Sequence, residues 1–502
     1  METASLVPGR RSPVLGVPAV LLAAALAAGC TAVGRTYVKP ALEAPASWTS
    51  TPEHTASGGA PDLATWWKAF GDPTLDALID RAAAANLDLR VAQARVREAR
   101  ALRGISAAAQ WPKVDAGATA QRLRDNLPPA PPDGIVTPYY QAGFDAAWEL
   151  DLFGGVRRGV EAADADLGAT VEEGRGVLVT VLAEVARNYV EARGLQRQLA
   201  VARETAGAQR ETVRVTRARL EAGLSSEFDA TRAEAQLAAF DAQIPALDSS
   251  LQRALHRLAV LLGQEPGALT ASLSTPGPIP APPPGVQVGL PSDLLLRRPD
   301  VRRAERDLAA ATARIGVAEA DLFPRLSLTG SFGFQSGTFE EFSAWSSRIW
   351  SFGPAVRWPL FEGGRVRANI RVQNARQEQA LLRYERALLA AVEDVDNALV
   401  SYGNEERRRR SLADAVAASG RALATADALY GAGLSEYLQV LDAQRSLHAA
   451  QLQLVQSETS VASSLVGLYK ALGGGWATPE ASAGPSASAS PREPKGQEKA
   501  RP

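Results

Sequence analysis

The chain has 502 residues, 46% of them hydrophobic and 22% charged, which is typical of a folded protein and argues against a disordered one. Its formal net charge of −1 provides no strong field that would favour nucleic acid or an anionic surface. Three histidines and one cysteine form no cluster with metal-ligand spacing, and no glycine-rich phosphate loop is present. We therefore predict no metal site, no cofactor and no enzyme activity.

The first 29 residues have the features of an export signal. Arg10 and Arg11 precede a short apolar stretch, Val14–Ala28, which is too short to span a bilayer comfortably. The stretch ends in LAAGC, which resembles a bacterial lipobox, although Ala27 stands where the pattern prefers leucine. We expect Cys30, the only cysteine, to be acylated, for example by palmitate, and to anchor the chain to a membrane. The alternative is a plain signal peptide with an incidental cysteine.

Most of the remaining sequence consists of two similar repeats. GLSSEFDATRAEAQL (Gly223–Leu237) matches GLSEYLQVLDAQRSL (Gly433–Leu447) without gaps, and WELDLFGG (Trp148–Gly155) matches WPLFEGG (Trp358–Gly364) with one residue gained or lost. Two further landmarks occur in the same order, which predicts a duplication. The expected segments are a signal peptide at 1–29, a lipidated segment at 30–70, repeats at 71–264 and 291–474, a Pro-rich linker at 265–290 and a low-complexity tail at 475–502.

Each repeat is expected to begin with a helix followed by two strands. The helices are predicted near Leu87–Gln110 and Asp300–Leu322, each ending before an aromatic–proline pair. The predicted strands are Val114–Ala120, Tyr140–Leu150, Leu326–Phe334 and Arg348–Leu360.

The strands alternate between an apolar and a small or polar face. Tyr140, Phe144 and Trp148 share one face of the second strand, while Asp145 and Glu149 share the other. Strands of about ten residues with this pattern are typical of a membrane β-barrel. A soluble sandwich that buries its apolar face has the same pattern, and the strands alone favour neither.

A pair of glycines ends the strands of each repeat. Gly154 and Gly155 in the first copy, and Gly363 and Gly364 in the second, are expected to turn the chain from strand into helix. The segments that follow are unusually long and free of proline.

Val156–Glu221 and Arg365–Tyr430 each predict a single helix of roughly 100 Å. Gly223 and Gly433 are expected to end these helices in tight hairpin turns. Return helices should then run to Leu262 and Leu472, the first of them kinked at Pro245.

Together these features resemble the TolC-type outer-membrane efflux factors, in particular the lipoprotein branch that serves resistance–nodulation–division pumps. The resemblance covers roughly Asp62 to Gly475. The motifs that carry it are WWKAFGDPTLDALIDRAAAANLDL, WELDLFGG, GLPSDLLLRRPDV, WPLFEGG and GLSEYLQVLDAQRSL.

The resemblance implies an α+β membrane protein of the bacterial outer membrane, extending into the periplasm. Three chains would pool four strands each into a 12-stranded β-barrel, continued by a periplasmic α-helical barrel. Pooling also answers a physical problem, because four strands cannot close by themselves and an open edge is excluded from lipid. The implied partners are two further copies, a periplasmic adaptor, an inner-membrane pump and outer-membrane lipid, with no nucleic acid.

The resemblance also places a periplasmic gate on the second hairpin. LQVLDAQR carries it onto Leu438, Asp442 and Arg445, and Tyr430 matches the family's tip tyrosine. The first three positions lie on one helical face, where the charged pair can form ion pairs within or between chains. The first repeat has Phe228, Arg232 and Ala235 at these places. The alternative is an ordinary surface pair worth a few tenths of a kcal/mol.

The resemblance also implies that the two hairpin tips dock the adaptor, and the alternative is that they are bare turns. The tip residues are Gly223, Leu224, Ser225, Gly433, Leu434 and Ser435. The sequence thus predicts the exit duct of an efflux system. A periplasmic adaptor lipoprotein and a soluble periplasmic enzyme are the alternatives.

Overall fold

The computed structural model describes residues 32–41, 45–49, 55–56, 63–125, 134–283, 286–287, 291 and 297–477. The predicted signal peptide, Cys30 and residues 478–502 of the predicted tail lie outside this range. Within the described part of the chain, no helix is both long enough and apolar enough to cross a membrane. The chain divides into two units, which are Met1–Glu43 with Val91–Gly174 and Asp300–Ala390, and Ala44–Arg90 with Arg175–Pro299 and Ala391–Pro502.

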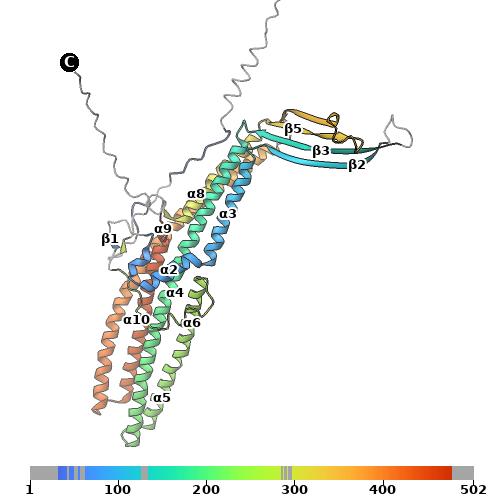
Figure 1. Ribbon diagram of the computed structural model, residues 1–502. Coiled ribbons are helices and arrows are strands. Elements are labelled where there is room, and N and C mark those ends of the chain that lie inside the picture. The colour runs from blue at the N-terminus through green and yellow to red at the C-terminus, as the bar shows by residue number, and fades with distance from the viewer. Residues whose placement is uncertain are drawn as a thin grey trace, which may run out of the picture. The chain divides into compact units, whose positions relative to one another are not determined.

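The first unit contains a four-stranded antiparallel sheet (Figure 1). Its strands, in spatial order, are β2 (Lys113–Asp125), β3 (Ile135–Leu150), β5 (Arg325–Ser336) and β6 (Arg348–Arg357). All four predicted strands are confirmed. β2 and β3 are longer than predicted, and β6 ends before the predicted Leu360.

The register confirms the predicted alternation. Phe144 of β3 lies opposite Phe332 of β5, which lies opposite Trp350 of β6. We call the side that carries these rings the apolar face, and the other side the polar face. Phe144 is 59% exposed, Phe332 46% and Trp350 71%, so no described part of the protein covers them. The sandwich alternative is therefore wrong, because it requires these rings to form a buried core.

Helices α3 (Leu87–Ala108) and α8 (Pro299–Ala320) precede the two strand pairs, within two residues of the prediction. The duplication is visible in how each joins the sheet. The Trp148 indole donates to the carbonyl of Gln110 at 3.0 Å. The equivalent Trp358 indole donates to the carbonyl of Leu322 at 3.1 Å. Each tryptophan thus satisfies a carbonyl beyond the end of the helix, which the helix itself leaves unpaired.

The two glycine pairs differ. Gly154 has a φ of +80°, whereas Gly155 is already the first residue of helix α4 and has no positive φ. In the second repeat both Gly363 (φ +57°) and Gly364 (φ +86°) adopt the left-handed conformation. Both pairs lie at the predicted strand-to-helix junctions, but only Gly154 of the first pair adopts the left-handed conformation that favours glycine.

The two long helices are confirmed almost to the residue. α4 spans Gly155–Glu221 and α9 spans Arg365–Gly431, with 67 residues each. The second return helix, α10 (Tyr437–Ala471), is continuous. The first is divided at Ala242 into α5 (Glu227–Asp241) and α6 (Gln243–Leu261).

The division confirms the expected interruption and shows its cause. Pro245 lies in the first turn of α6, where its missing N–H needs no partner. In one continuous helix the same proline would clash with the preceding turn. The chain therefore ends α5 shortly before Pro245.

The second unit has a large apolar core around the middle of the hairpins. The 3₁₀ helix η1 (Trp66–Phe70) and helix α2 (Pro73–Ala85) pack there, and Trp66 stacks on Tyr469 of α10 with ring centroids 5.2 Å apart. The remaining elements are a parallel pair, β1 (Thr55–Ala56) with β4 (Val286–Gln287), and η2 (Trp345–Ser347) in the first unit.

The first part of the Pro-rich linker, residues 269–275, is attached to this core. Leu269 and Leu273 are 2% and 4% exposed. Gln196 of α4 donates to the carbonyl of Leu273 at 2.6 Å, and Arg193 donates to the carbonyl of Thr275 at 2.9 Å. The composition of this segment suggests only a spacer. It does not reveal these contacts, because the side chains that hold the linker are far away in the sequence.

Candidate functional site at the hairpin tips

Both long helices end in the same type of turn. Gly223 (φ +71°) and Gly433 (φ +73°) are left-handed, as predicted. The N–H of Leu224 bonds to the carbonyl of Arg219 at 2.8 Å, and that of Leu434 bonds to the carbonyl of Leu429 at 2.9 Å. These are Schellman turns, which favour glycine at the left-handed position.

The turns present leucine to solvent. Leu224 is 68% exposed and Leu434 is 76% exposed, so each tip ends in an apolar side chain beside the Ser225 or Ser435 hydroxyl group.

The return helices begin differently. Ser226 and Asp229 form a reciprocal capping box at the start of α5. At the start of α10 the N-cap is Glu436, whose side chain makes no capping hydrogen bond. A capping box of this kind stabilises a helix start by about 1 kcal/mol, so the start of α10 lacks a stabilising contact that the start of α5 has.

Two tyrosines flank the second turn. Tyr430 lies in the last turn of α9 and Tyr437 is the first residue of α10, with ring centroids 5.7 Å apart. Each is held by α4 of the first hairpin. The Arg219 guanidinium lies 4.5 Å from the Tyr430 ring centroid and donates to the Tyr430 carbonyl at 3.2 Å. Gln209 donates to the Tyr437 hydroxyl at 3.2 Å.

The three predicted gate residues on α10 lie on one helix, but they differ in their contacts. Leu438 is 37% exposed. The Arg445 guanidinium donates to Oε1 of Gln236 on α5 at 2.6 Å. Asp442 is exposed and makes no hydrogen bond or ion pair with any residue that the structure describes. An Asp442–Arg445 surface pair within the chain is therefore not formed in this structure, and the Asp442 carboxylate is exposed to solvent.

Further along, His448 joins three helices. Its Nδ1 lies 3.1 Å from the Thr205 hydroxyl of α4, and its Nε2 lies 3.2 Å from Oε1 of Gln243 in α6. Because the amide oxygen only accepts, Nε2 carries the proton and Nδ1 accepts from the threonine. The side chain is 5% exposed, and burial lowers the pKa of its imidazole below the usual 6.5.

The interface between the hairpins also leaves buried polar atoms unsatisfied. Gln209 Oε1, Gln444 Oε1 and Arg219 Nε have no hydrogen-bond partner in the described part of the chain. The same three side chains bond across the two hairpins through their other polar atoms, with Tyr437, Thr212 and Tyr430 as partners. The sequence pattern does not single out Arg219 or Gln209, because helical spacing does not show that they reach another hairpin.

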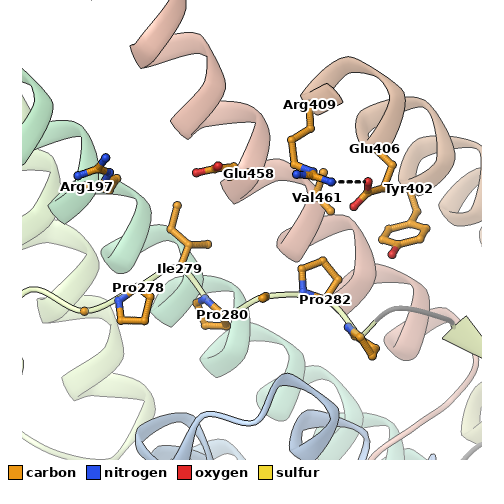
Figure 2. A pocket seen from close by; sticks show the side chains of 13 residues that line it. Arg197, Pro278, Ile279, Pro280, Pro282, Tyr402, Glu406, Arg409, Glu458 and Val461 are labelled. Carbon is orange, nitrogen blue, oxygen red and sulfur yellow. Dashed lines mark hydrogen bonds and ion pairs between the residues drawn. The ribbon is translucent and has the colours of Figure 1, made fainter. Parts of the chain in front are cut away.

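A cavity lies beside the linker, away from the tips. It has a volume of about 570 Å³ and is lined by linker residues 277–283, by Tyr402, Glu406 and Arg409 of α9, and by side chains of α4 and α10 (Figure 2). Glu406 and Arg409 are paired at 3.1 Å. The linker therefore forms one wall of an open groove lined by side chains of both hairpins.

Known proteins share this duplicated architecture. A sequence model of outer membrane efflux proteins matches residues 78–264 and 290–474, that is, both repeats. The chain belongs to the outer membrane efflux protein family.

Individual members of the outer membrane efflux protein family are similar to this chain in sequence and in structure. Nodulation protein T of Rhizobium leguminosarum bv. trifolii is 33% identical over 91% of this chain and 97% of that protein. The outer membrane protein OprJ of Pseudomonas aeruginosa is 34% identical over 93% of this chain and 97% of OprJ. Among solved structures, the outer-membrane channel OprN superposes with a TM-score of 0.83 at 39% identity, over 88% of this chain and 99% of that one. The channel CusC gives 0.77 at 28% identity, over 88% and 100%.

The predicted family is confirmed, and so is the predicted role as an outer-membrane efflux channel. The adaptor alternative is not supported, because the channel family matches both copies of the plan.

Proposed function

We propose that three copies of this chain form the exit duct of a tripartite efflux system. The observation that carries the proposal is the sheet of the first unit. β2 and β6 are the edge strands of this four-stranded sheet, and the apolar face is exposed to the surroundings. An open edge cannot remain unpaired in lipid.

The strand directions allow identical copies to close the sheet. The order β2-β3-β5-β6 is antiparallel throughout, so β6 runs opposite to β2. β6 of one copy can therefore pair with β2 of the next in the same antiparallel pattern. Three copies would give twelve strands, with the apolar face towards lipid and the polar face towards a water-filled lumen. The helices would continue this barrel into the periplasm.

Lipidation of Cys30 is part of the proposal. Two residues later in the sequence, Ala32 lies against the turn between β3 and α4, where a Cβ on Gly154 would stand 2.5 Å from the Ala32 Cα. The Val33 N–H bonds to the Phe153 carbonyl at 2.9 Å, and Arg158 donates to the Val33 carbonyl at 3.1 Å. Two residues span at most about 7 Å, so an acyl chain on Cys30 would enter the membrane near the strand–helix junction.

The proposed gate is Leu438, Asp442 and Arg445 with Tyr430, and the proposed adaptor docking points are the exposed leucines and their neighbours at the two tips. In a closed ring the unpaired Asp442 carboxylate would meet a cation of a neighbouring copy. An inner-membrane resistance–nodulation–division pump would supply the energy.

The test is the single-channel conductance of the purified full chain in a planar bilayer. We expect a small wild-type conductance that rises sharply in Asp442→Ala/Arg445→Ala. No channel in either protein would refute the duct. A large wild-type conductance that the double substitution does not change would leave the duct and remove the gate.

A further inference from the structure

The charges of the sheet are divided between its two faces. Three arginines lie on the apolar face, namely Arg122 and Arg124 of β2 and Arg348 of β6. The register places them there, because Arg122 lies opposite Pro138 and Arg348 lies opposite Phe334. They are the only charged side chains on that face among the described strand residues. The polar face carries the acidic residues Asp115, Asp145 and Glu149.

The arginines also lie at one end of the sheet. The helices join at the end formed by Lys113, Leu150, Arg325 and Arg357. Arg122 and Arg348 lie towards the opposite end, where β2 finishes and β6 begins. Between the two ends the apolar face is uncharged, from Val114 to Ala120 on β2 and from Trp350 to Val356 on β6. The change from apolar to cationic is therefore abrupt and occurs on both edge strands.

Aromatic rings accompany the cations. The Arg348 guanidinium lies 4.5 Å from the Trp345 ring centroid and donates to the Trp345 carbonyl at 2.9 Å. Trp345 is 67% exposed. Phe339 is 71% exposed, with its ring centroid 5.7 Å from that of Tyr140. Exposed aromatic rings beside cations at the border of an apolar band are typical of the headgroup layer of a membrane.

We propose that Arg122 and Arg348 bind the phosphate groups of lipid headgroups in the outer leaflet of the membrane. This inference rests on the proposed duct, in which the end of the sheet away from the helices faces outward. Edge-to-edge closure makes β6 of one copy the neighbour of β2 of the next. Each subunit junction then brings outward-facing arginines from two chains to the same rim. A planar guanidinium matches phosphate bidentately, which makes arginine suited to this contact.

Two glutamates in the connection between β5 and β6, Glu340 and Glu341, oppose phosphate binding. Neutralising one of these glutamates removes a negative charge from the same rim and should therefore act in the opposite direction to neutralising an arginine. Arg357 provides a matched control, because it is an exposed arginine of β6 on the polar face at the helix end.

The experiment measures binding of lipid A, with and without its two phosphates, to the purified full-length protein by native mass spectrometry. We expect Arg122→Gln/Arg348→Gln to weaken binding of the phosphorylated lipid at least about tenfold. Arg357→Gln should stay within about twofold, and Glu341→Gln should bind at least as well as the wild type. The wild type itself should prefer the phosphorylated lipid by about tenfold.

Equal binding of the two lipids by the wild type would overturn the inference, even if the double variant failed to fold. Unchanged binding in the double variant would overturn it too, as would an equal loss in Glu341→Gln. Planar-bilayer conductance of the same wild-type preparation separates the two proposals. A channel without phosphate preference refutes only the lipid site, whereas absence of a channel refutes the duct.

Discussion

Arg219 of the first hairpin holds Tyr430 of the second in two ways, through its ring and through its main chain. The guanidinium lies 4.5 Å from the ring centroid and donates to the Tyr430 carbonyl at 3.2 Å. That carbonyl belongs to the last turn of α9, where the helix dipole concentrates partial negative charge and favours a cation. One side chain thus ties the end of α9 to α4.

Arg219→Gln should loosen the second tip. Loss of a charged hydrogen bond and a cation–π contact costs about 1–3 kcal/mol, which changes the ratio of open to closed gates about 5-fold or more. Single-channel conductance and its open probability measure this directly.

Arg217→Gln is the matched control for that change. Arg217 lies on the same helix, but it pairs with Glu234 of its own hairpin at 2.7 Å. Equal conductance changes in Arg217→Gln and Arg219→Gln would show that net charge at the tip, and not the tie to Tyr430, controls the gate.

The buried imidazole of His448 should make stability depend on pH. Its pKa is lowered by burial, so the folded state binds the proton less readily than the unfolded state. The stabilisation is therefore complete above about pH 6.5 and is lost as the pH falls towards the folded-state pKa, with a slope of at most about 1.4 kcal/mol per pH unit. Burial is the cause of this lower pKa, and Arg445, one turn before His448 on α10, is bonded to Gln236.

Thermal unfolding between pH 7.5 and pH 5, as rough limits around the usual imidazole pKa, checks this. His448→Gln keeps an amide in place of the imidazole and should flatten the pH profile. His256→Gln, at an exposed position, should leave the profile as in the wild type. Parallel profiles for wild type and His448→Gln would contradict the assignment.

Gly194 marks a close approach between α4 and α10. A Cβ there would stand 2.8 Å from Cγ2 of Thr459. Gly194→Ala should therefore lower the free energy of unfolding by about 1–3 kcal/mol, as overpacked cores do. Thr459→Ala in the same chain should restore part of the loss.

Gly207, on the same helix, has open space around it, since a Cβ at this position would meet no atom within 4 Å. Gly207→Ala should raise the free energy of unfolding by about 1 kcal/mol through helix propensity alone. Denaturant titration of Gly194→Ala, Gly194→Ala/Thr459→Ala and Gly207→Ala tests both expectations. Stabilisation of both glycine variants would show that α4 and α10 do not pack closely at Gly194.

A hydrogen-bonded chain connects α2 to the linker through α4. Asp72 caps α2 by accepting from the Thr74 N–H at 2.8 Å, and it also accepts from the Tyr189 hydroxyl at 2.6 Å. Arg193 donates to that hydroxyl at 3.0 Å. Tyr189→Phe should cost about 1 kcal/mol, and Asp72→Ala should cost about 2 kcal/mol, because it removes the cap as well. Chemical denaturation would show the order, and equal costs would mean that the cap contributes nothing.

The sequence by itself determined the elements and their repetition. Proline-free stretches of 67 residues and alternating strands are local patterns, and their boundaries follow from glycine and from proline after an aromatic residue. It also determined that Leu438, Asp442 and Arg445 lie on one helix, because helical spacing alone decides this.

Only the tertiary structure decided which of those side chains find partners within the chain. Arg445 bonds to Gln236 and Asp442 to none of the described residues, although both share a helical face with Leu438. The roles of Arg219, His448 and the linker were likewise invisible in the sequence, since each depends on contacts between segments far apart in the chain. A residue's neighbours on its own helix follow from a fixed period, whereas its neighbours on another helix follow from packing, which no period encodes.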